Sequence, residues 1–305
     1  MPLISVITAT YNRSNVLRHA VASVRRQTLT DWELIVVGDA CTDDTASVVT
    51  SVDDARIRFV NLDRNHGEQS VPNNHGVGLA TGAYLAFLNH DDLWFSDHLM
   101  TVSTALERSR ADLAYSLSAR VDAEGRVHLW GDSPEGVYRF WHPVPASVWL
   151  MRRELAEQVG PWAPAWRLWD SPSQHWLRRA HASGAALTPV PRLTAVQITS
   201  GGRTGSYRNR DQDEHDAAAL AMHDEAAYRE QLLTDIAIGS SSMSAYSRPL
   251  APATLALKAT LARLSASAGI PPAGLFNAIR YRRRGGFIRH LRKVRGLTPA
   301  TEDRK

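Results

Sequence analysis

Two adjacent carboxylates, Asp91 and Asp92, follow a short apolar run at residues 84–88. A run of this kind predicts a buried strand, and both aspartates at its end can face a crevice. Carboxylate oxygens are the ligands that hard divalent cations such as Mg²⁺ and Mn²⁺ prefer, and these cations also bridge phosphates. The pair is therefore a candidate site for a cation that holds a diphosphate. The alternative is a solvated turn whose aspartates cap a helix beginning near Ser96.

The elements around this pair alternate between strand and helix. Strands are expected at residues 3–10, 32–37, 57–62 and 84–88, and helices at 14–27, 42–52, 71–80 and 96–108. Such alternation with short connections is typical of a mostly parallel sheet covered by helices on both faces. In these sheets ligands bind beyond the carboxyl ends of the strands. Three polar segments, 10–13, 38–40 and 89–92, are therefore expected to meet at one edge.

The composition is that of a globular protein with an uneven distribution of charge. The chain has 305 residues, of which 44% are hydrophobic, and a net charge of +4. It contains no apolar run long enough to predict a transmembrane helix, and residues 1–7 resemble a first strand more than a signal peptide. The single cysteine, Cys41, excludes an intrachain disulfide and fits a cytoplasmic protein. Residues 236–305 hold 13 basic and 2 acidic residues, so an acidic body carries a basic tail.

The pattern changes after Asp112. A hairpin is expected at 114–121 and 127–130, a short strand at 147–151, and an extended segment at 187–198 interrupted by Pro189 and Pro191. Helices are expected at 172–182, 212–236, 253–268 and 273–295, the last weakened by Gly285 and Gly286. We predict an α/β domain at 1–205, with halves 1–110 and 111–205, and a helical C-terminal region at 206–305.

Four motifs occur in the order found in one known family. They are Ser5 to Arg13 with its Tyr11-Asn12 pair, Glu33 to Thr45, Asn74-His75-Gly76 followed by Ala80-Thr81-Gly82, and Tyr84 to Leu93. Together they resemble glycosyltransferase family 2, the inverting enzymes of the GT-A fold. The likeness is strong over residues 3–105 and weak over 106–200. It implies an α/β fold of the GT-A type, which is Rossmann-like, with a mostly parallel central sheet and flanking helices.

The resemblance implies a role for each matched residue. Asp39 would accept a hydrogen bond from the base, Asp91 would contact the ribose or the diphosphate, and Asp92, together with Asp91, would hold Mn²⁺ or Mg²⁺. The rest of the nucleotide pocket would be formed by Thr10, Tyr11, Arg13 and Asn74. A UDP-sugar is the favoured donor because Asp39 fits the imide of uracil, although thymine and guanine also remain open.

Three positions depart from the family pattern. Gly38 replaces an aspartate, Asn73 stands where an arginine is frequent, and Asn89 replaces the first aspartate of the Asp-x-Asp-Asp site. Two carboxylates therefore remain where the family has three. We expect the metal to bind more weakly, or to depend on phosphates and water for its other ligands.

The catalytic base has two candidates, Asp170 and His175. The family has an acidic pair before an aromatic-Leu-Arg run, and Trp176-Leu177-Arg178 matches that run. An inverting displacement needs one base, and either residue type serves near neutral pH. Trp162, Trp166 and Trp169 lie just before the candidates and are expected on the acceptor side, because sugars pack on aromatic rings. The alternative for each tryptophan is a place in the core.

The basic tail suits a contact with an anionic surface. Phe287, Ile288, Leu291 and Val294 fall on one helical face at residues 280–295, with most charges opposite. This pattern predicts an amphipathic helix on an anionic membrane, with a packed or solvated helix or a nucleic-acid arm as alternatives. The expected protein is a peripheral, cytoplasmic glycosyltransferase that acts on a saccharide, lipid-linked or other hydroxyl acceptor. The alternative is a non-catalytic sugar-nucleotide-binding or scaffolding protein with the same fold.

Overall fold

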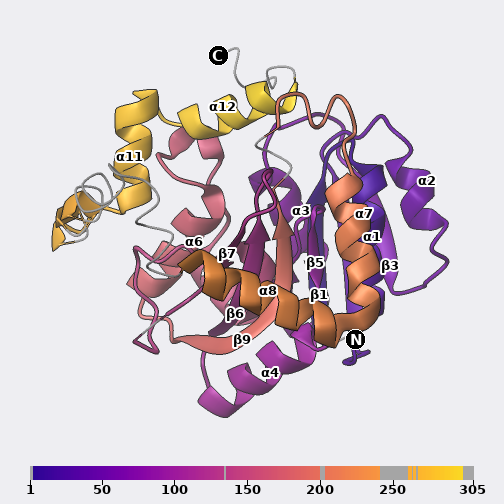
Figure 1. Ribbon diagram of the computed structural model, residues 1–305, viewed down its shortest axis with the longest axis horizontal. Helices are drawn as coiled ribbons and strands as arrows, with labels where there is room; N and C mark the ends of the chain where they lie inside the picture. Colours follow the sequence, from indigo (N-terminus) through magenta and orange to yellow (C-terminus); the bar gives the residue numbers. More distant parts are fainter. Residues whose placement is uncertain are drawn as a thin grey trace.

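The computed structural model describes residues 3–133, 135–199, 203–240, 260–262, 264–265 and 267–297. Within these residues nine strands form one sheet (Figure 1). The strands are β1 (Ile4–Thr10), β2 (Trp32–Gly38), β3 (Ile57–Asn61), β4 (Tyr84–Phe87), β5 (Asp92–Trp94), β6 (Leu113–Val121), β7 (Val127–Trp130), β8 (Trp149–Arg152) and β9 (Leu187–Ile198). The expected helix at 253–268 lies largely outside the described residues.

The strand order is β3-β2-β1-β4-β8-β6-β9-β5, with β7 paired to β6. The first four strands are parallel, as the alternation of strands and helices predicts. In the second half β8 runs antiparallel to both of its neighbours, and β6 pairs with β9 in parallel. The expected interruption at Pro189 and Pro191 is wrong, because a register shift opposite Ser116 and Leu117 keeps β9 continuous.

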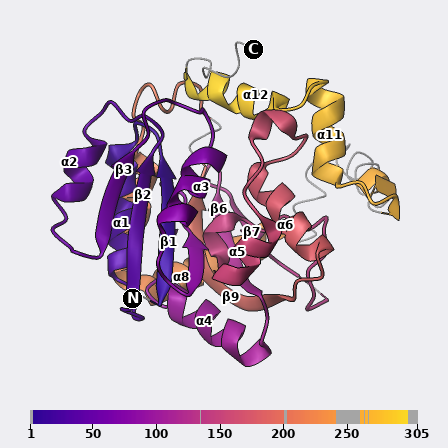
Figure 2. The same ribbon diagram turned by 180° about the vertical axis from the view of Figure 1, so that it is seen from behind.

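Helices cover both faces of the sheet (Figures 1 and 2). Helices α1 (Ser14–Arg25) and α7 (Asp213–Ala221) lie on one face, and α3 (Ser70–Leu79) and α5 (Arg153–Val159) lie on the other. The remaining helices of the body are α2 (Thr45–Thr50), α4 (His98–Ser109), α6 (Pro172–Ala182) and α8 (Glu225–Ser240). The expected GT-A type of fold with flanking helices is confirmed. The sheet, expected to be mostly parallel, is mixed, because β8 and the pairs β6–β7 and β5–β9 are antiparallel.

The carboxyl ends of the parallel strands are positioned by a dense apolar core. Val6, Leu34 and Leu85 lie on three neighbouring strands, and each has no exposed surface. Gly82 lets the turn before β4 approach β1, because a Cβ there would lie 2.7 Å from the backbone nitrogen of Ser5. Burial of this kind, at roughly 25 cal/mol per Å² of apolar surface, fixes the frame on which the polar strand ends are mounted.

The C-terminal helices differ from the sequence prediction. The helix expected at 212–236 is divided, because a 3₁₀ turn at Met222–Asp224 separates α7 from α8. The helix expected at 273–295 is also divided, into α11 (Pro272–Tyr281) and α12 (Gly286–Arg295). The break falls at Gly285, whose φ of +68° is a left-handed conformation that favours glycine.

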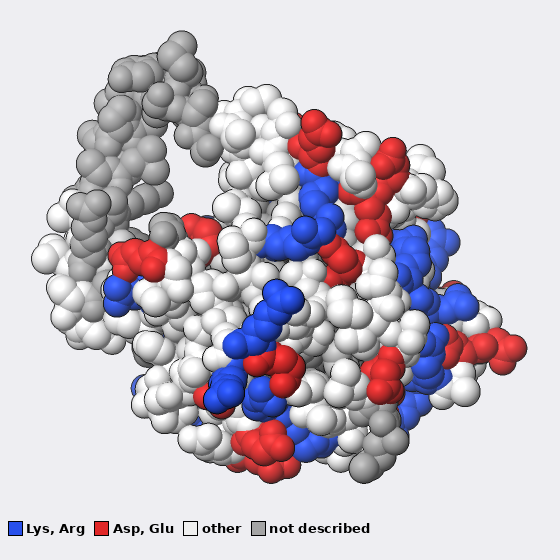
Figure 3. All heavy atoms as spheres, turned by 90° about the horizontal axis from the view of Figure 1, so that it is seen from below, with Lys and Arg blue, Asp and Glu red and all other residues white. Residues whose placement is uncertain are grey.

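Helix α12 crosses the edge of the body where the parallel strands end (Figure 1). The opposite face, seen in Figure 3, shows acidic and basic side chains interspersed. None of the helices within the described residues is both long enough and apolar enough to cross a membrane.

Candidate active site

A cavity of about 650 Å³ opens at the carboxyl ends of the parallel strands. The three polar strand ends meet there, as the sequence predicts. Thr10 ends β1 and Tyr11 follows it, Asp39 follows β2, and Asn89 to Asp92 connect β4 to the start of β5. The backbone N–H of Asp39 donates to the carbonyl of Thr10 at 2.8 Å, so the first two ends are held together directly. The volume falls within the range of about 300–1,000 Å³ typical of small-molecule sites.

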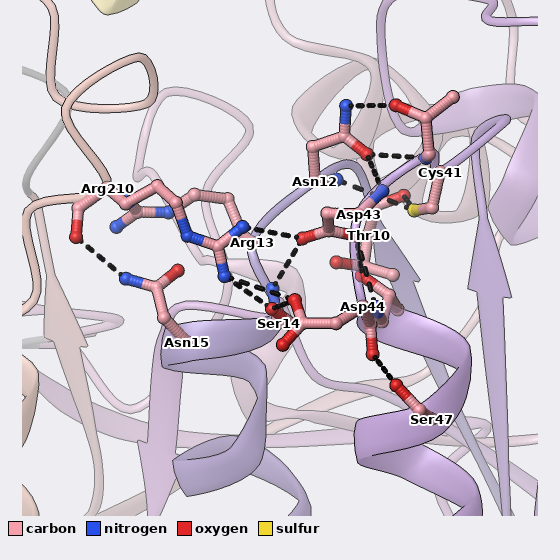
Figure 4. A network of polar contacts seen from close by, with 12 residues as sticks. Thr10, Asn12, Arg13, Ser14, Asn15, Cys41, Asp43, Asp44, Ser47 and Arg210 are labelled. Carbon is pink, nitrogen blue, oxygen red and sulfur yellow. Dashed lines mark hydrogen bonds and ion pairs between the residues drawn. The ribbon is translucent and has the colours of Figure 1, made fainter.

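Side chains cross-link the loops that follow β1 and β2 (Figure 4). The side-chain oxygen of Asn12 accepts a hydrogen bond from the backbone N–H of Thr42 at 2.8 Å. Arg210, which comes from the C-terminal half, donates to Asp43 at 3.1 Å and to the hydroxyl of Ser14 at 2.6 Å. These contacts fix the short turn between β1 and α1, and with it Tyr11 at the cavity wall.

Asp39 is bound tightly by the loop at residues 65–67. One carboxylate oxygen accepts the backbone N–H of His66 at 2.8 Å. The other accepts the N–H of Gly67 at 2.8 Å and the side-chain amide of Asn65 at 3.0 Å. Burial raises the pKa of Asp39, and the two backbone hydrogen bonds oppose that rise. Asp39 thus shapes the loop and also lines the cavity.

Asp92 lies at the floor of the cavity with one oxygen fully engaged. Its Oδ2 accepts hydrogen bonds from Ser147 at 2.5 Å, from Asn89 at 2.9 Å and from Gln197 at 3.4 Å. Burial, with the charge of Asp91 next, raises the pKa of Asp92 to about 7. Asn89, which stands where the family has an acid, therefore orients the remaining carboxylate.

Asp91 has an opposite electrostatic environment. Burial acts to raise its pKa, but His90, Arg295, His215 and Arg13 together hold it below the usual range. His90 is itself fixed, because its ring nitrogens meet the carbonyl of Ala9 at 3.1 Å and the hydroxyl of Tyr207 at 3.0 Å. The lowered pKa of Asp91 favours its charged form, which suits a cation beside Asp92.

The donor set fits one divalent cation of the Mg²⁺ or Mn²⁺ type. Asp91 and Asp92 both line the cavity, and the three hydrogen bonds described above all go to Oδ2 of Asp92 and leave its Oδ1 available. The described residues contain no cluster of three or more acidic, histidine or cysteine side chains that could hold a metal alone. A cation here would therefore take its other ligands from phosphate and water, in keeping with the preference of Mg²⁺ for such mixed shells.

Another part of the cavity wall comes from the second half of the chain. The hairpin of β6 and β7 contributes Arg120 and Trp130, with the guanidinium carbon of Arg120 4.6 Å from the Trp130 ring centre. Gln197 of β9 and Ser171 at the start of α6 complete this side. Sequence reasoning did not single out these four residues. They lie far apart along the chain, and only the pairing of β6 with β7 and β9 brings them together.

The two candidate bases lie at the start of α6, just outside the cavity wall. Asp170 accepts from Arg178 at 2.7 Å and from the N–H of Ser171 at 2.7 Å. His175 lies further along α6 and is half-buried, and burial, followed by the charge of Arg179, lowers its pKa. Neither side chain lines the cavity, although Ser171 and Pro172 between them do.

The three candidate acceptor tryptophans do not line this cavity. Trp162 is 3% exposed and packs in the core, with its ring centre 4.8 Å from that of Phe87. Trp166 lines a small adjoining pocket and meets Gly285 at the start of α12. Trp169 is 37% exposed and packs near Gly274 of α11. Trp166 and Trp169 therefore support the C-terminal helices.

Two residues expected in the nucleotide pocket instead tie distant segments together. Arg13 has no exposed surface and donates to the carbonyls of Ser206 at 3.0 Å and Asp211 at 2.8 Å. Asn74 exchanges two hydrogen bonds with the backbone of Trp162, at 2.8 and 3.0 Å. Neither lines the cavity. These contacts could not be predicted from the sequence, because the partners of Arg13 and of Asn74 lie more than 80 residues away.

The tail helix is the largest difference from the sequence prediction. Phe287, Ile288 and Leu291, expected to contact a membrane, line the cavity together with Arg292 and Arg295. The predicted amphipathic pattern is present, but its apolar face is directed at the protein. Glu68 also lines the cavity and was missed, since nothing in the sequence distinguishes it from a surface glutamate.

A mixed sheet with carboxylates at the ends of its parallel strands, above a cavity of this size, defines the class of GT-A glycosyltransferases. The chain belongs to glycosyltransferase family 2, whose model, described as "Glycosyl transferase family 2", matches residues 5–158. That match covers the carboxylate wall of the cavity and ends before α6.

Curated relatives agree with this assignment. The chain is 39% identical over 124 residues to the putative teichuronic acid biosynthesis glycosyltransferase TuaG of Bacillus subtilis, covering 39% of this chain and 49% of the relative. It is 40% identical over 131 residues to the GalNAc(5)-diNAcBac-PP-undecaprenol beta-1,3-glucosyltransferase of Campylobacter jejuni, covering 42% and 41%. The chain thus spans about half the length of these relatives.

A solved structure shares the fold. S. aureus TarS, residues 1–349 in complex with UDP-GlcNAc, has a TM-score of 0.55 and 18% identity, covering 77% of this chain and 71% of that one. At this identity the likeness concerns the fold alone.

Proposed function

We propose that the chain is an inverting, metal-dependent glycosyltransferase that transfers a sugar from a UDP-sugar to a hydroxyl of a lipid-linked or saccharide acceptor. The observation that carries this proposal is the convergence of Asp39, Asp91 and Asp92 on one cavity. The names of these relatives, which mention an undecaprenol-linked acceptor and teichuronic acid, support a role in cell-surface glycan synthesis. The UDP-GlcNAc complex of TarS supports the choice of uracil as the base.

The proposed reaction is a single displacement at the anomeric carbon. The acceptor oxygen forms a bond to that carbon while the bond to the diphosphate oxygen breaks, and the diphosphate leaves with the electron pair. A protein base takes the proton of the acceptor hydroxyl. A divalent cation on Asp91 and Asp92 would offset the charge of the leaving diphosphate. Asp39 would contact the uracil of the donor. The β6–β7 hairpin, with Arg120 and Trp130, would contact the acceptor.

Asp170 is the base that we favour over His175. The residues that directly follow Asp170 line the cavity, whereas His175 lies further along α6. The ion pair with Arg178 orients the Asp170 carboxylate. Asp170→Asn is expected to lower kcat by about a thousandfold and to leave UDP affinity unchanged, with His175→Gln as the matched comparison. A larger loss in His175→Gln than in Asp170→Asn would transfer the role to the histidine.

The proposed function is tested by donor turnover. The purified protein is expected to hydrolyse or transfer the sugar of a UDP-sugar in the presence of Mn²⁺, and EDTA is expected to stop the reaction. The competing proposal, a non-catalytic sugar-nucleotide-binding protein, is favoured by the engagement of Asp170 with Arg178 outside the cavity wall. Tight UDP binding with no turnover on any acceptor or on water would support that second function.

We also propose a peripheral contact with an anionic membrane. The surface that makes this contact differs from the apolar helix face expected from the sequence. The apolar face of α12 lines the cavity, so the contact would fall to the exposed basic residues Arg282, Arg283, Arg284 and Lys293. Basic residues near an anionic surface contribute about 1 kcal/mol each. A lipid-linked acceptor would be presented at the same surface.

A further inference from the structure

Helix α12 is fixed to the body at both of its ends. At its start the N–H of Gly285 donates to the carbonyl of Leu168 at 2.7 Å. At its end the N–H of Gly205 donates to the carbonyl of Val294 at 2.7 Å, and the N–H of Tyr207 donates to the carbonyl of Arg295 at 3.2 Å. The helix is therefore a fixed part of the cavity wall, to which Phe287, Ile288 and Leu291 contribute. Figure 1 shows the helix crossing the body where the parallel strands end.

The glycines that flank α12 make these contacts possible. Gly285 and Gly296 have φ values of +68° and +78°. A Cβ on Gly285 would lie 2.6 Å from the Cα of Trp166, which is too close for any side chain. A Cβ on Gly296 would lie 3.3 Å from the Cα of Gly205. Gly285 and Gly286, expected to weaken one long helix at 273–295, instead mark the point where the short helix α12 begins and docks on the body.

The inner side of α12 brings two guanidinium groups to the cavity. Arg292 donates to the carbonyl of Gly67 at 2.8 Å, in the same loop whose N–H groups hold Asp39. The guanidinium carbon of Arg295 lies 4.8 Å from the ring centre of Tyr207. The Nε–H of Arg295 is buried and has no hydrogen-bond acceptor among the described residues. A buried, unsatisfied charged donor at a ligand cavity indicates an acceptor that arrives with the ligand.

We propose that α12 forms the roof of the donor site and that Arg292 and Arg295, on its inner side, bind the diphosphate of the sugar nucleotide. This inference rests on the proposed function and deepens it. The charges support it, because the carboxylates of Asp39, Asp91 and Asp92 repel a diphosphate unless positive groups in the cavity offset them. Guanidinium groups match phosphate oxygens in charge and geometry. Only two carboxylates remain to hold the cation. The two arginines supply further positive charge for the diphosphate.

The first test measures binding of UDP, UMP and uridine by calorimetry, with Mn²⁺ and with EDTA. Arg295→Ala is expected to weaken UDP binding by about tenfold and to leave uridine binding unchanged, because only the phosphates lose a charged partner. Lys293→Ala is the matched control, since it removes one positive charge from the outer side of the same helix. In EDTA the wild-type protein is expected to keep a preference for UDP over uridine, and Arg295→Ala is expected to lose it.

A second pair of variants tests the roof without touching a charge. Gly285→Ala is expected to undock α12 and to weaken UDP binding by about tenfold or more, because its Cβ meets the backbone of Trp166. Gly269→Ala carries the same kind of strain, with φ of +71°, but nothing lies within 4 Å of its Cβ. It is expected to bind UDP as the wild type does.

Each outcome decides between the two proposals. If UDP binding is the same in wild type, Arg295→Ala and Gly285→Ala, the roof and its arginines are wrong, while the proposed function stands. An equal loss of uridine and UDP affinity in Arg295→Ala would also overturn the contact with the diphosphate. A wild-type protein that binds none of UDP, dTDP and GDP would overturn the proposed function and this inference together.

Discussion

Two walls of the large cavity carry opposite charges and are built in opposite ways. The carboxylate wall consists of strand ends, and its residues follow β1, β2 and β4 directly. The arginine wall is one helix from the far end of the chain, fixed by a few backbone contacts at its two ends. The first wall is positioned by the burial of the sheet, and the second by contacts that single substitutions can remove. The two walls line one cavity but differ in what holds them in place.

The largest expected effect comes from breaking the carboxylate wall at Asp92. Asp92→Asn is expected to lower kcat by about a thousandfold, since the proposed cation that offsets the charge of the leaving diphosphate loses a carboxylate ligand. The variant is not expected to lose stability at pH 8, because burial already raises the pKa of Asp92 to about 7 and so disfavours its charged form. Turnover of the UDP-sugar and the melting temperature would be measured side by side. Full activity in this variant would remove Asp92 from the proposed site.

The next effect comes from the loop at residues 65–67, which connects the two walls. Asp39→Ala is expected to destabilise the protein by about 2–4 kcal/mol, because several hydrogen bonds to a buried carboxylate disappear. The loop also accepts from Arg292, so faster hydrogen exchange is expected in α12 as well. Chemical denaturation gives the first quantity and amide exchange the second. Unchanged exchange in α12 would show that the walls are independent.

A smaller, pH-dependent effect is expected at Glu68. Burial raises the pKa of Glu68 to about 7, above its unfolded value. Its stabilising contribution is therefore complete below about pH 4.5 and is lost as pH rises through 7. Glu68→Gln is expected to be more stable than wild type at pH 8 by up to about 3 kcal/mol, with the difference disappearing near pH 4.5. Denaturation curves at several pH values test this, and a difference that does not vary with pH would contradict the assigned cause.

The smallest effect concerns the outer side of the arginine wall. Lys293→Ala is expected to weaken binding to vesicles of anionic lipid by about fivefold at low salt, with no change in UDP affinity. Cosedimentation with anionic and neutral vesicles measures the effect. If Lys293→Ala loses as much affinity for neutral vesicles as for anionic ones, the outer side of α12 does not bind membranes through its charge.

The carboxylate wall could be predicted from the sequence because its signals are local. Asp91 and Asp92 directly follow a strand that the apolar run identifies, and parallel strands end at one edge. The placement of Arg13 and of α12 could not be predicted in this way. Arg13 contacts residues near Asp211, and Arg292 contacts Gly67, across separations that no local pattern encodes. The amphipathic pattern of α12 predicts that one face of the helix is buried. It does not identify the surface that covers this face.

The proposed function requires that the cavity bind a nucleoside diphosphate together with a divalent cation. The most direct measurement is the melting temperature of the wild-type protein with UDP, with Mn²⁺, and with both together. We predict a rise of about 5 °C or more with both at about 100 times the dissociation constant, and a smaller rise with UDP alone. The absence of any metal-dependent shift with UDP, dTDP or GDP would contradict the account.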